Sequence, residues 1–198
     1  GLGNPLQPGT YYVGVTNVNK TNPAAYTLAS RGIGAGFSVR VTDLAFSGGS
    51  VSQALPAREG AWYRVEVPSS TPSWKVALNF DAGDGLLLAQ RGFLPNIGAD
   101  PTNLLAMALG GKKMQKAGDE HLLALPAGTN LNLLPGTWYL GVIGEGANPS
   151  NAVARIGTGS SSFTLFSQGV LPPWDLGAIG AQDLLAQTTL QGGECKTY

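Results

Sequence analysis

The sequence LLPGTWYLGV at residues 133–142 has a near copy, LQPGTYYVGV, at residues 6–15. Each copy is followed by an Asn-Pro pair and then by a stretch of alternating side chains, AYTLASRG at 25–32 and SFTLFSQG at 162–169. Alternation of this kind predicts β-strands with one buried face. The two copies begin 127 positions apart (133 minus 6), which is the length of a domain and far longer than the period of a solenoid.

Short strands and tight turns account for most of the remaining sequence. Stretches rich in β-branched and aromatic residues predict strands at 39–41, 62–67, 74–80 and 163–166. Turn signals made of Gly, Pro, Ser and Asp separate them, at 48–49, 68–72, 81–85, 126–128 and 135–136. Two stretches are compatible with short helices, 102–109 and 178–187. The sequence therefore predicts an all-β fold, an antiparallel β-sandwich of jelly-roll type.

A second and weaker internal match places the domain boundaries. Residues 39–63 align without gaps with residues 174–198, so that Tyr63 falls on Tyr198. The two matches predict the closing hairpin of a preceding repeat, one complete sandwich domain, and a linker with the opening strands of a following repeat, at 1–35, 36–171 and 172–198. Incomplete repeats expose strand edges. We expect the flanks to pack on the central domain, to belong to a truncated multidomain protein, or to complete a sandwich by donor-strand exchange between subunits.

Composition excludes several classes of function. Twelve basic residues balance twelve acidic ones, without the basic clusters that nucleic-acid binding requires. No apolar run approaches the roughly 20 residues that span a bilayer. A hydrophobic content of 43% is sufficient for a core, which argues against disorder. Cys195 is the only cysteine, so no internal disulfide is expected.

The motifs that close each repeat resemble those of the bacterial pre-peptidase C-terminal domain. A Pro-Gly turn, an aromatic-rich strand and a final Tyr-Thr-Leu-type strand are matched twice, by LLPGTWYLGV with SFTLFS and by LQPGTYYVGV with AYTLAS. Earlier parts of the family pattern are matched at 61–68, 74–80 and 81–92, so the resemblance covers most of 36–171 and both flanks. It implies a jelly-roll-like β-sandwich, an accessory module of secreted or cell-surface bacterial proteins and, in some members, a structural calcium.

Asp81 and Asp84 are the candidate calcium ligands. Calcium prefers several oxygen ligands from loops, and these two carboxylates flank one Gly-rich turn. Asp119 and Glu120 would add a second pair if the strands lie close together. Asp-Gly turns are also common without a metal, and here Gly85 interrupts the acidic strand pattern of the family. A purely structural turn is therefore the alternative.

Catalytic constellations are absent from the sequence. It contains no nucleophile elbow, phosphate-binding loop, dinucleotide fingerprint or zinc-protease motif. The only histidine, His121, follows Asp119 and Glu120 at the head of a predicted strand, where we expect it to be exposed to solvent. Cys195 has no other histidine to act as its base. A hydrolase with an acidic pair remains as an alternative, and it requires two carboxylates that converge in a cleft.

Three aromatic doublets are candidate ligand or interface residues: Tyr11-Tyr12, Trp62-Tyr63 and Trp138-Tyr139. Successive side chains of a strand point to opposite faces, so one ring of each doublet should enter the core and the other should point outward. Outward rings are suited to stacking on sugars or to forming an apolar patch for a neighbouring domain. Packing across strands is the simpler alternative. The Lys-rich stretch at 112–116 is predicted to be a solvated loop.

Together these features predict a non-catalytic structural, adhesion or assembly module of a large secreted or cell-surface bacterial protein. Its expected partners are adjacent repeats of the same polypeptide or neighbouring subunits. Two alternatives are kept open besides the hydrolase. One is a carbohydrate- or polymer-binding accessory module of a secreted hydrolase, and the other is an extracellular filament subunit that assembles by strand exchange.

Overall fold

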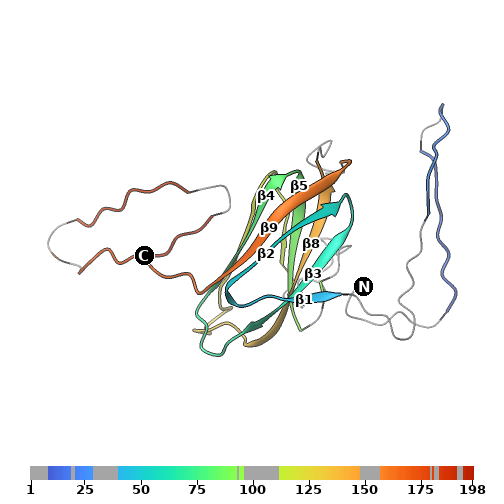
Figure 1. Ribbon diagram of the computed structural model, residues 1–198. Coiled ribbons are helices and arrows are strands. Elements are labelled where there is room, and N and C mark those ends of the chain that lie inside the picture. The colour runs from blue at the N-terminus through green and yellow to red at the C-terminus, as the bar shows by residue number, and fades with distance from the viewer. Residues whose placement is uncertain are drawn as a thin grey trace.

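Two β-sheets packed face to face form the body of the protein (Figure 1). The computed structural model describes residues 9–18, 21–28, 40–92, 94–95, 112–147, 157–178, 180, 183–190 and 194–198. The five-stranded sheet has the order β1 (Val41–Asp43), β3 (Gly60–Val67), β8 (Gly136–Gly146), β5 (Asp84–Arg91) and β6 (Lys112–Met114). The four-stranded sheet has the order β2 (Ser47–Pro56), β9 (Ser160–Gly169), β4 (Trp74–Ala82) and β7 (Glu120–Ala124). The predicted all-β sandwich is thereby confirmed.

The core lies between the two sheets and is built from alternating side chains of both. Trp74 is fully buried at its centre, and its ring meets that of Trp138 edge to face at 5.7 Å between centroids. The indole N–H of Trp74 donates to Ser167 Oγ at 2.9 Å, so its one polar group is satisfied inside the core. Strands predicted at 62–67, 74–80 and 163–166 form parts of β3, β4 and β9.

The chain changes sheets where local sequence predicts simple hairpins. β8 and β9 lie in different sheets, so residues 133–169 do not form the hairpin that the repeated phrase predicts. β4 and β5 also lie in different sheets and are joined at Gly83, which has a φ of 77°. A Cβ at Gly83 would lie 2.8 Å from the carbonyl oxygen of Gly146, so only glycine fits this crossing.

Strand pairing is antiparallel except between β1 and β3, where Val41 lies opposite Trp62 in a parallel pair. The prediction of a loop at 112–116 is wrong in its first half, because Lys112–Met114 forms β6 and pairs with β5. The apolar Met114 packs against the core and fixes this edge strand. Residues 102–109 lie outside the described residues, and the described residues of 178–187 form no helix.

Two segments lie outside the sandwich. The N-terminal segment, defined as residues 9–28 with a gap at 19–20, contains no strand in its described part, and all its described side chains are exposed. The C-terminal segment, residues 170–198, likewise contains no strand among its described residues. Figure 1 shows the two segments on opposite sides of the sandwich.

Candidate functional site

The N-terminal segment exposes the side chains that its internal copy buries. Val13 corresponds to Leu140 of β8, and Leu28 corresponds to Leu165 of β9. Val13 is 71% exposed and Leu28 is 59% exposed, whereas both counterparts are fully buried between the sheets. The same contrast holds for three further positions, listed with their buried counterparts: Tyr11 and Trp138, Val15 and Val142, Tyr26 and Phe163. In the part of the chain that the structure describes, the N-terminal segment therefore exposes the face whose counterpart in the sandwich forms the core.

The C-terminal segment folds back on itself and touches the sandwich at one end. The amide N–H of Trp174 donates to the carbonyl oxygen of Thr197 at 2.7 Å. The ring of Trp174 meets that of Tyr198 edge to face at 6.1 Å, and Lys196 Nζ lies 5.1 Å from the Trp174 ring centroid. Glu194 forms an ion pair of 3.8 Å with Lys75, a buried residue of β4. The end of the chain is thus held beside residue 174.

The outward ring of the Trp62-Tyr63 doublet is covered by its own sheet. Trp62 is only 8% exposed and packs in a small second cluster on the outer face of the five-stranded sheet, with Leu86, Leu88 and Ile143. It lies directly over Gly141 of β8, where a Cβ would approach the ring to 2.4 Å. Trp62 therefore packs across strands, as in the simpler of the alternatives for the doublets.

The other rings of the doublets divide between the core and the surface. Tyr63 points into the core, where burial raises its pKa to about 12 and its hydroxyl donates to Gln53 Oε1 at 3.0 Å. Trp138 points into the core, and Tyr139 lies half-buried on the outer face opposite Arg64. The Trp62-Tyr63 and Trp138-Tyr139 doublets thus each place one ring in the core and one on the outer face of the sheet, as predicted. In the N-terminal segment, Tyr11 and Tyr12 are both exposed.

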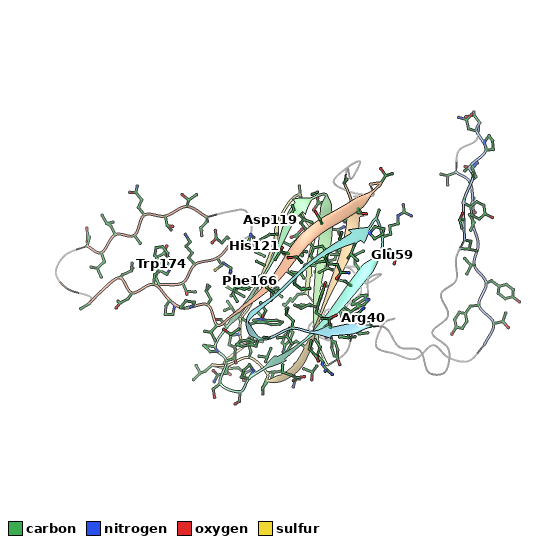
Figure 2. The ribbon with its side chains drawn as sticks, viewed as in Figure 1. Arg40, Glu59, Asp119, His121, Phe166 and Trp174 are labelled. Carbon is green, nitrogen blue, oxygen red and sulfur yellow. The ribbon has the colours of Figure 1, made fainter. Side chains whose placement is uncertain are left out.

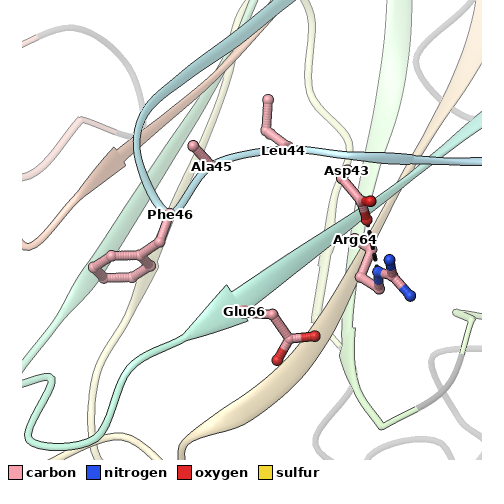
Figure 3. A pocket seen from close by; sticks show the side chains of 6 residues that line it. All are labelled: Asp43, Leu44, Ala45, Phe46, Arg64 and Glu66. Atoms are coloured by element: carbon pink, nitrogen blue, oxygen red, sulfur yellow. Dashed lines mark hydrogen bonds and ion pairs between the residues drawn. The ribbon is translucent and has the colours of Figure 1, made fainter.

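A hollow of about 330 Å³ opens where the chain leaves β1, between apolar residues and a charged rim (Figure 3). Arg64 Nε donates to Asp43 Oδ1 at 2.7 Å, and this hydrogen bond lowers the pKa of the Asp43 carboxyl. On the same rim, Glu66 accepts a hydrogen bond of 2.7 Å from Thr137 Oγ1. The ring of Phe46 packs toward Trp74 at 6.2 Å. The charges of the rim are therefore engaged within the chain.

Two buried carboxylates hold the connection between β6 and β7. Glu120, 2% exposed, accepts the backbone N–H of Lys116, and Glu145 accepts a hydrogen bond from the side chain of Gln115. Burial raises the pKa of Glu120 to about 7, with a smaller contribution from the charge of Glu145. Burial also raises the pKa of Glu145. Since both groups are buried and bonded to the same short connection, they anchor it.

The candidate calcium ligands differ in their surroundings. Asp81 is exposed, whereas Asp84 is buried and its Oδ1 accepts the N–H of Gly85 at 2.9 Å. Asp119 does lie close to this region, because its Oδ1 accepts the N–H of Phe80 at 2.8 Å. Within the residues that the structure describes, no three Asp, Glu, His or Cys side chains come together as a metal site. Calcium at Asp81 and Asp84 stays a prediction.

His121 is less accessible than the sequence suggests. It lies half-buried on the outer face of the four-stranded sheet, in one cross-strand row with Ala77 and Phe166 (Figure 2). Burial lowers the pKa of His121, followed by the charges of Lys116 and Lys75. Its Nδ1 is buried, and the described part of the chain offers it no hydrogen-bond partner. The expectation of a solvent-exposed histidine is therefore met only in part, since the residue is half-buried and its Nδ1 is buried.

The apolar residues Val13, Val15 and Leu28, which distinguish the N-terminal segment from its copy, are not among the residues predicted from the sequence. A signal is present, since the alternation of the repeated sequence marks them as inward-facing positions. The Lys75–Glu194 ion pair, which links β4 to a segment more than a hundred residues later in the chain, was not predicted either. Nothing in the local sequence of either residue indicates that contact.

Solved structures with a similar fold include the two described below. No family model and no curated protein matches the chain. The pre-peptidase C-terminal domain of a collagenase from Bacillus anthracis is similar over 65% of this chain and 94% of its own, at 12% identity and a TM-score of 0.38. Aeromonas hydrophila PliG, a periplasmic inhibitor of g-type lysozyme, is similar over 65% of this chain and 96% of its own, at 10% identity and a TM-score of 0.35.

The first of these structures belongs to the family that the repeat motifs resemble. At such identities and TM-scores, neither similarity bears on function. Within its described residues, the chain has no helix of the length and apolar character needed to cross a membrane.

Proposed function

We propose that this protein is a non-catalytic assembly module whose N-terminal segment completes another β-sandwich of the same kind. In this role it belongs to a secreted or cell-surface bacterial protein, where such domains are joined to neighbouring repeats or subunits. The observation that carries the proposal is the contrast between Val13 and Leu28, which are exposed, and their counterparts Leu140 and Leu165, which are fully buried.

The driving force is the burial of apolar side chains. Transferring one large aliphatic or aromatic side chain from water into a core contributes about 1.5–3 kcal/mol. The N-terminal segment presents five such side chains at positions whose counterparts are core residues: Tyr11, Val13, Val15, Tyr26 and Leu28. Exposed strand sequences with one apolar face are also templates for pairing with another chain.

The carbohydrate alternative has less support from the geometry. Trp62 and Trp138 are both largely buried, the first over Gly141 and the second in the core. Stacking on a sugar requires an accessible ring face, and of the two doublets within the sandwich only Tyr139 offers a half-buried ring on the outer face. The enzyme alternative requires converging accessible carboxylates, whereas Glu120 and Glu145 are buried and bonded to Gln115 and Lys116.

Sedimentation velocity over a range of protein concentrations tests the proposal with two neighbouring substitutions. Leu28→Asp places a charge at a position whose counterpart is buried, and Thr27→Asp places it at a position whose counterpart, Thr164, lies on the outer face of the sheet. Because both residues are exposed in the single chain, neither change should unfold it. We expect the unaltered chain and Thr27→Asp to associate and Leu28→Asp to stay monomeric. Monomeric behaviour of the unaltered chain, or equal association of all three, would contradict the proposal.

A further inference from the structure

We infer that the C-terminal segment of one chain pairs with the N-terminal segment of a second copy, in the register of β3 and β8. This inference rests on the proposed function and names the partner of the N-terminal segment. Residues 174–198 correspond to 39–63, which contain β1, β2 and the start of β3, whereas residues 6–15 correspond to 133–142, which contain most of β8. The two segments therefore hold strand sequences that are neighbours in the sandwich.

The C-terminal segment brings its two ends together as β1 and β3 do, but in a register displaced by two residues, because Trp174 corresponds to Val39 and Thr197 to Trp62. In the sandwich, these strands are parallel neighbours, with Val41 opposite Trp62. In the C-terminal segment, the Trp174 N–H donates to the Thr197 carbonyl oxygen, and the rings of Trp174 and Tyr198 are in contact. The Lys196 side chain also bonds to Thr188 Oγ1 and to the Thr189 carbonyl oxygen. By analogy with β3, the further backbone partner of residues 196–198 would be a strand in the place of β8.

The order of strands in the five-stranded sheet indicates where the N-terminal segment would add. The five-stranded sheet begins with β1, β3 and β8 in that order, so the N-terminal segment would add as the third strand beside residues 196–198. β3 pairs with β8 through Tyr63 opposite Leu140 and Trp62 opposite Gly141. Transferred through the two sequence matches, this antiparallel register places Tyr198 opposite Val13, Thr197 opposite Gly14, and Lys196 opposite Val15.

Pairing between copies is favoured over pairing within one chain. The described parts of the N-terminal and C-terminal segments lie on opposite sides of the sandwich (Figure 1). The ion pair between Glu194 and Lys75, together with the hydrogen bond of 3.1 Å from the Leu171 N–H to Ser73 Oγ, ties the C-terminal segment to the body. Each chain then offers one segment of each kind, and such a head-to-tail contact generates rings or open chains of subunits.

The single cysteine allows a direct test of the register. Cys195 corresponds to Gly60, and Gly60 lies opposite Ile143, whose counterpart is Thr16. A Cβ at Gly60 would lie 2.9 Å from Ile143 Cδ1, so side chains at these two positions share one face and lie close together. Directly opposed residues of antiparallel strands have Cα atoms about 4.5–5.5 Å apart, within the range that a disulfide bridges.

The experiment compares the full chain carrying Thr16→Cys with the matched control Asn17→Cys. Both positions are exposed in the single chain, and position 17 faces the other side of the strand. Under mild oxidation with a glutathione redox couple, we expect Thr16→Cys to form a ladder of disulfide-linked chains at least tenfold faster than Asn17→Cys. In the background of Cys195→Ser, Thr16→Cys should give no species larger than a linked dimer.

Equal ladders from the two variants, or a disulfide closed within the monomer of Thr16→Cys, would overturn the inference. The proposed function is judged separately by the sedimentation of the unaltered chain. Association that Leu28→Asp abolishes, together with no preferential cross-link from Thr16→Cys, would leave the proposed function intact and reject this partner. An unaltered chain that does not associate at all would reject both.

Discussion

Replacing Glu120 with Gln should remove most of a pH dependence of folding stability. Glu120 is buried at the start of β7, and burial raises the pKa of its carboxyl from 4.5 to about 7. The positive charge of Lys116 opposes this increase, and the negative charges of Glu145 and Asp119 add to it. The folded protein therefore holds a proton on Glu120 at pH values where the unfolded chain has lost it.

The sign and the size of the effect follow from proton linkage. Between pH 4.5 and about 7 the folded state binds more protons than the unfolded state, so the free energy of unfolding falls as the pH rises and then levels off. At about 1.4 kcal/mol per pH unit, this interval corresponds to about 3 kcal/mol. A glutamine keeps an oxygen that can accept the N–H of Lys116 and carries no charge. We therefore expect Glu120→Gln to match the unaltered protein near pH 4 and to exceed its stability by about 3 kcal/mol at pH 8.

Urea unfolding at several pH values between 4 and 8 measures this difference. Glu66→Gln is a matched control, because it makes the same substitution at an exposed position on the outer face of β3. Burial also raises the pKa of Glu145, so some pH dependence should persist in the Glu120→Gln variant. A profile for Glu120→Gln that parallels that of the unaltered protein over the whole range would refute the reasoning.

Two further predictions concern the sandwich itself. Trp74→Phe should lower the free energy of unfolding by about 2 kcal/mol, because it removes the bond to Ser167 Oγ and leaves a cavity in the core; an unchanged midpoint in urea would count against this. Gly141→Ala should cost about 1–3 kcal/mol by forcing the Trp62 ring to move. The matched change at the counterpart, Gly14→Ala, meets open space and should leave the stability of the single chain unaffected.

The fold class and the facing of side chains could be predicted from the sequence. Alternation is a local property, so it correctly identified the strands at 62–67 and 74–80 and the division of Trp138 and Tyr139 between two faces. Which strands pair is not a local property. The sequence around Gly83 is that of a tight hairpin, yet the chain crosses there from one sheet to the other. A Cβ at Gly83 would collide with Gly146 and Ser161, which are distant in the sequence.

The candidate site was only partly predictable for the same reason. The repeated sequence identifies the N-terminal segment, and its alternation marks Val13, Val15 and Leu28 as inward-facing positions. Their exposure could not be predicted, since it depends on what packs beside the segment and not on the segment itself. The parallel pairing of β1 with β3 was likewise not predicted, because Val41–Asp43 is too short to carry a pattern that distinguishes parallel from antiparallel neighbours.

The alternation of the N-terminal segment also limits the registers in which it can pair. Val13 and Val15 correspond to inward positions of β8, and Gly14 corresponds to Gly141 on the outer face. Backbone hydrogen bonds form in many registers, but a slip of one residue would turn both valines outward and bring Gly14 to the core-facing side. The register is therefore selected by burial. For this reason a charge at position 28 tests whether the apolar face is buried at all, whereas a cysteine at position 16 tests which strand lies beside it.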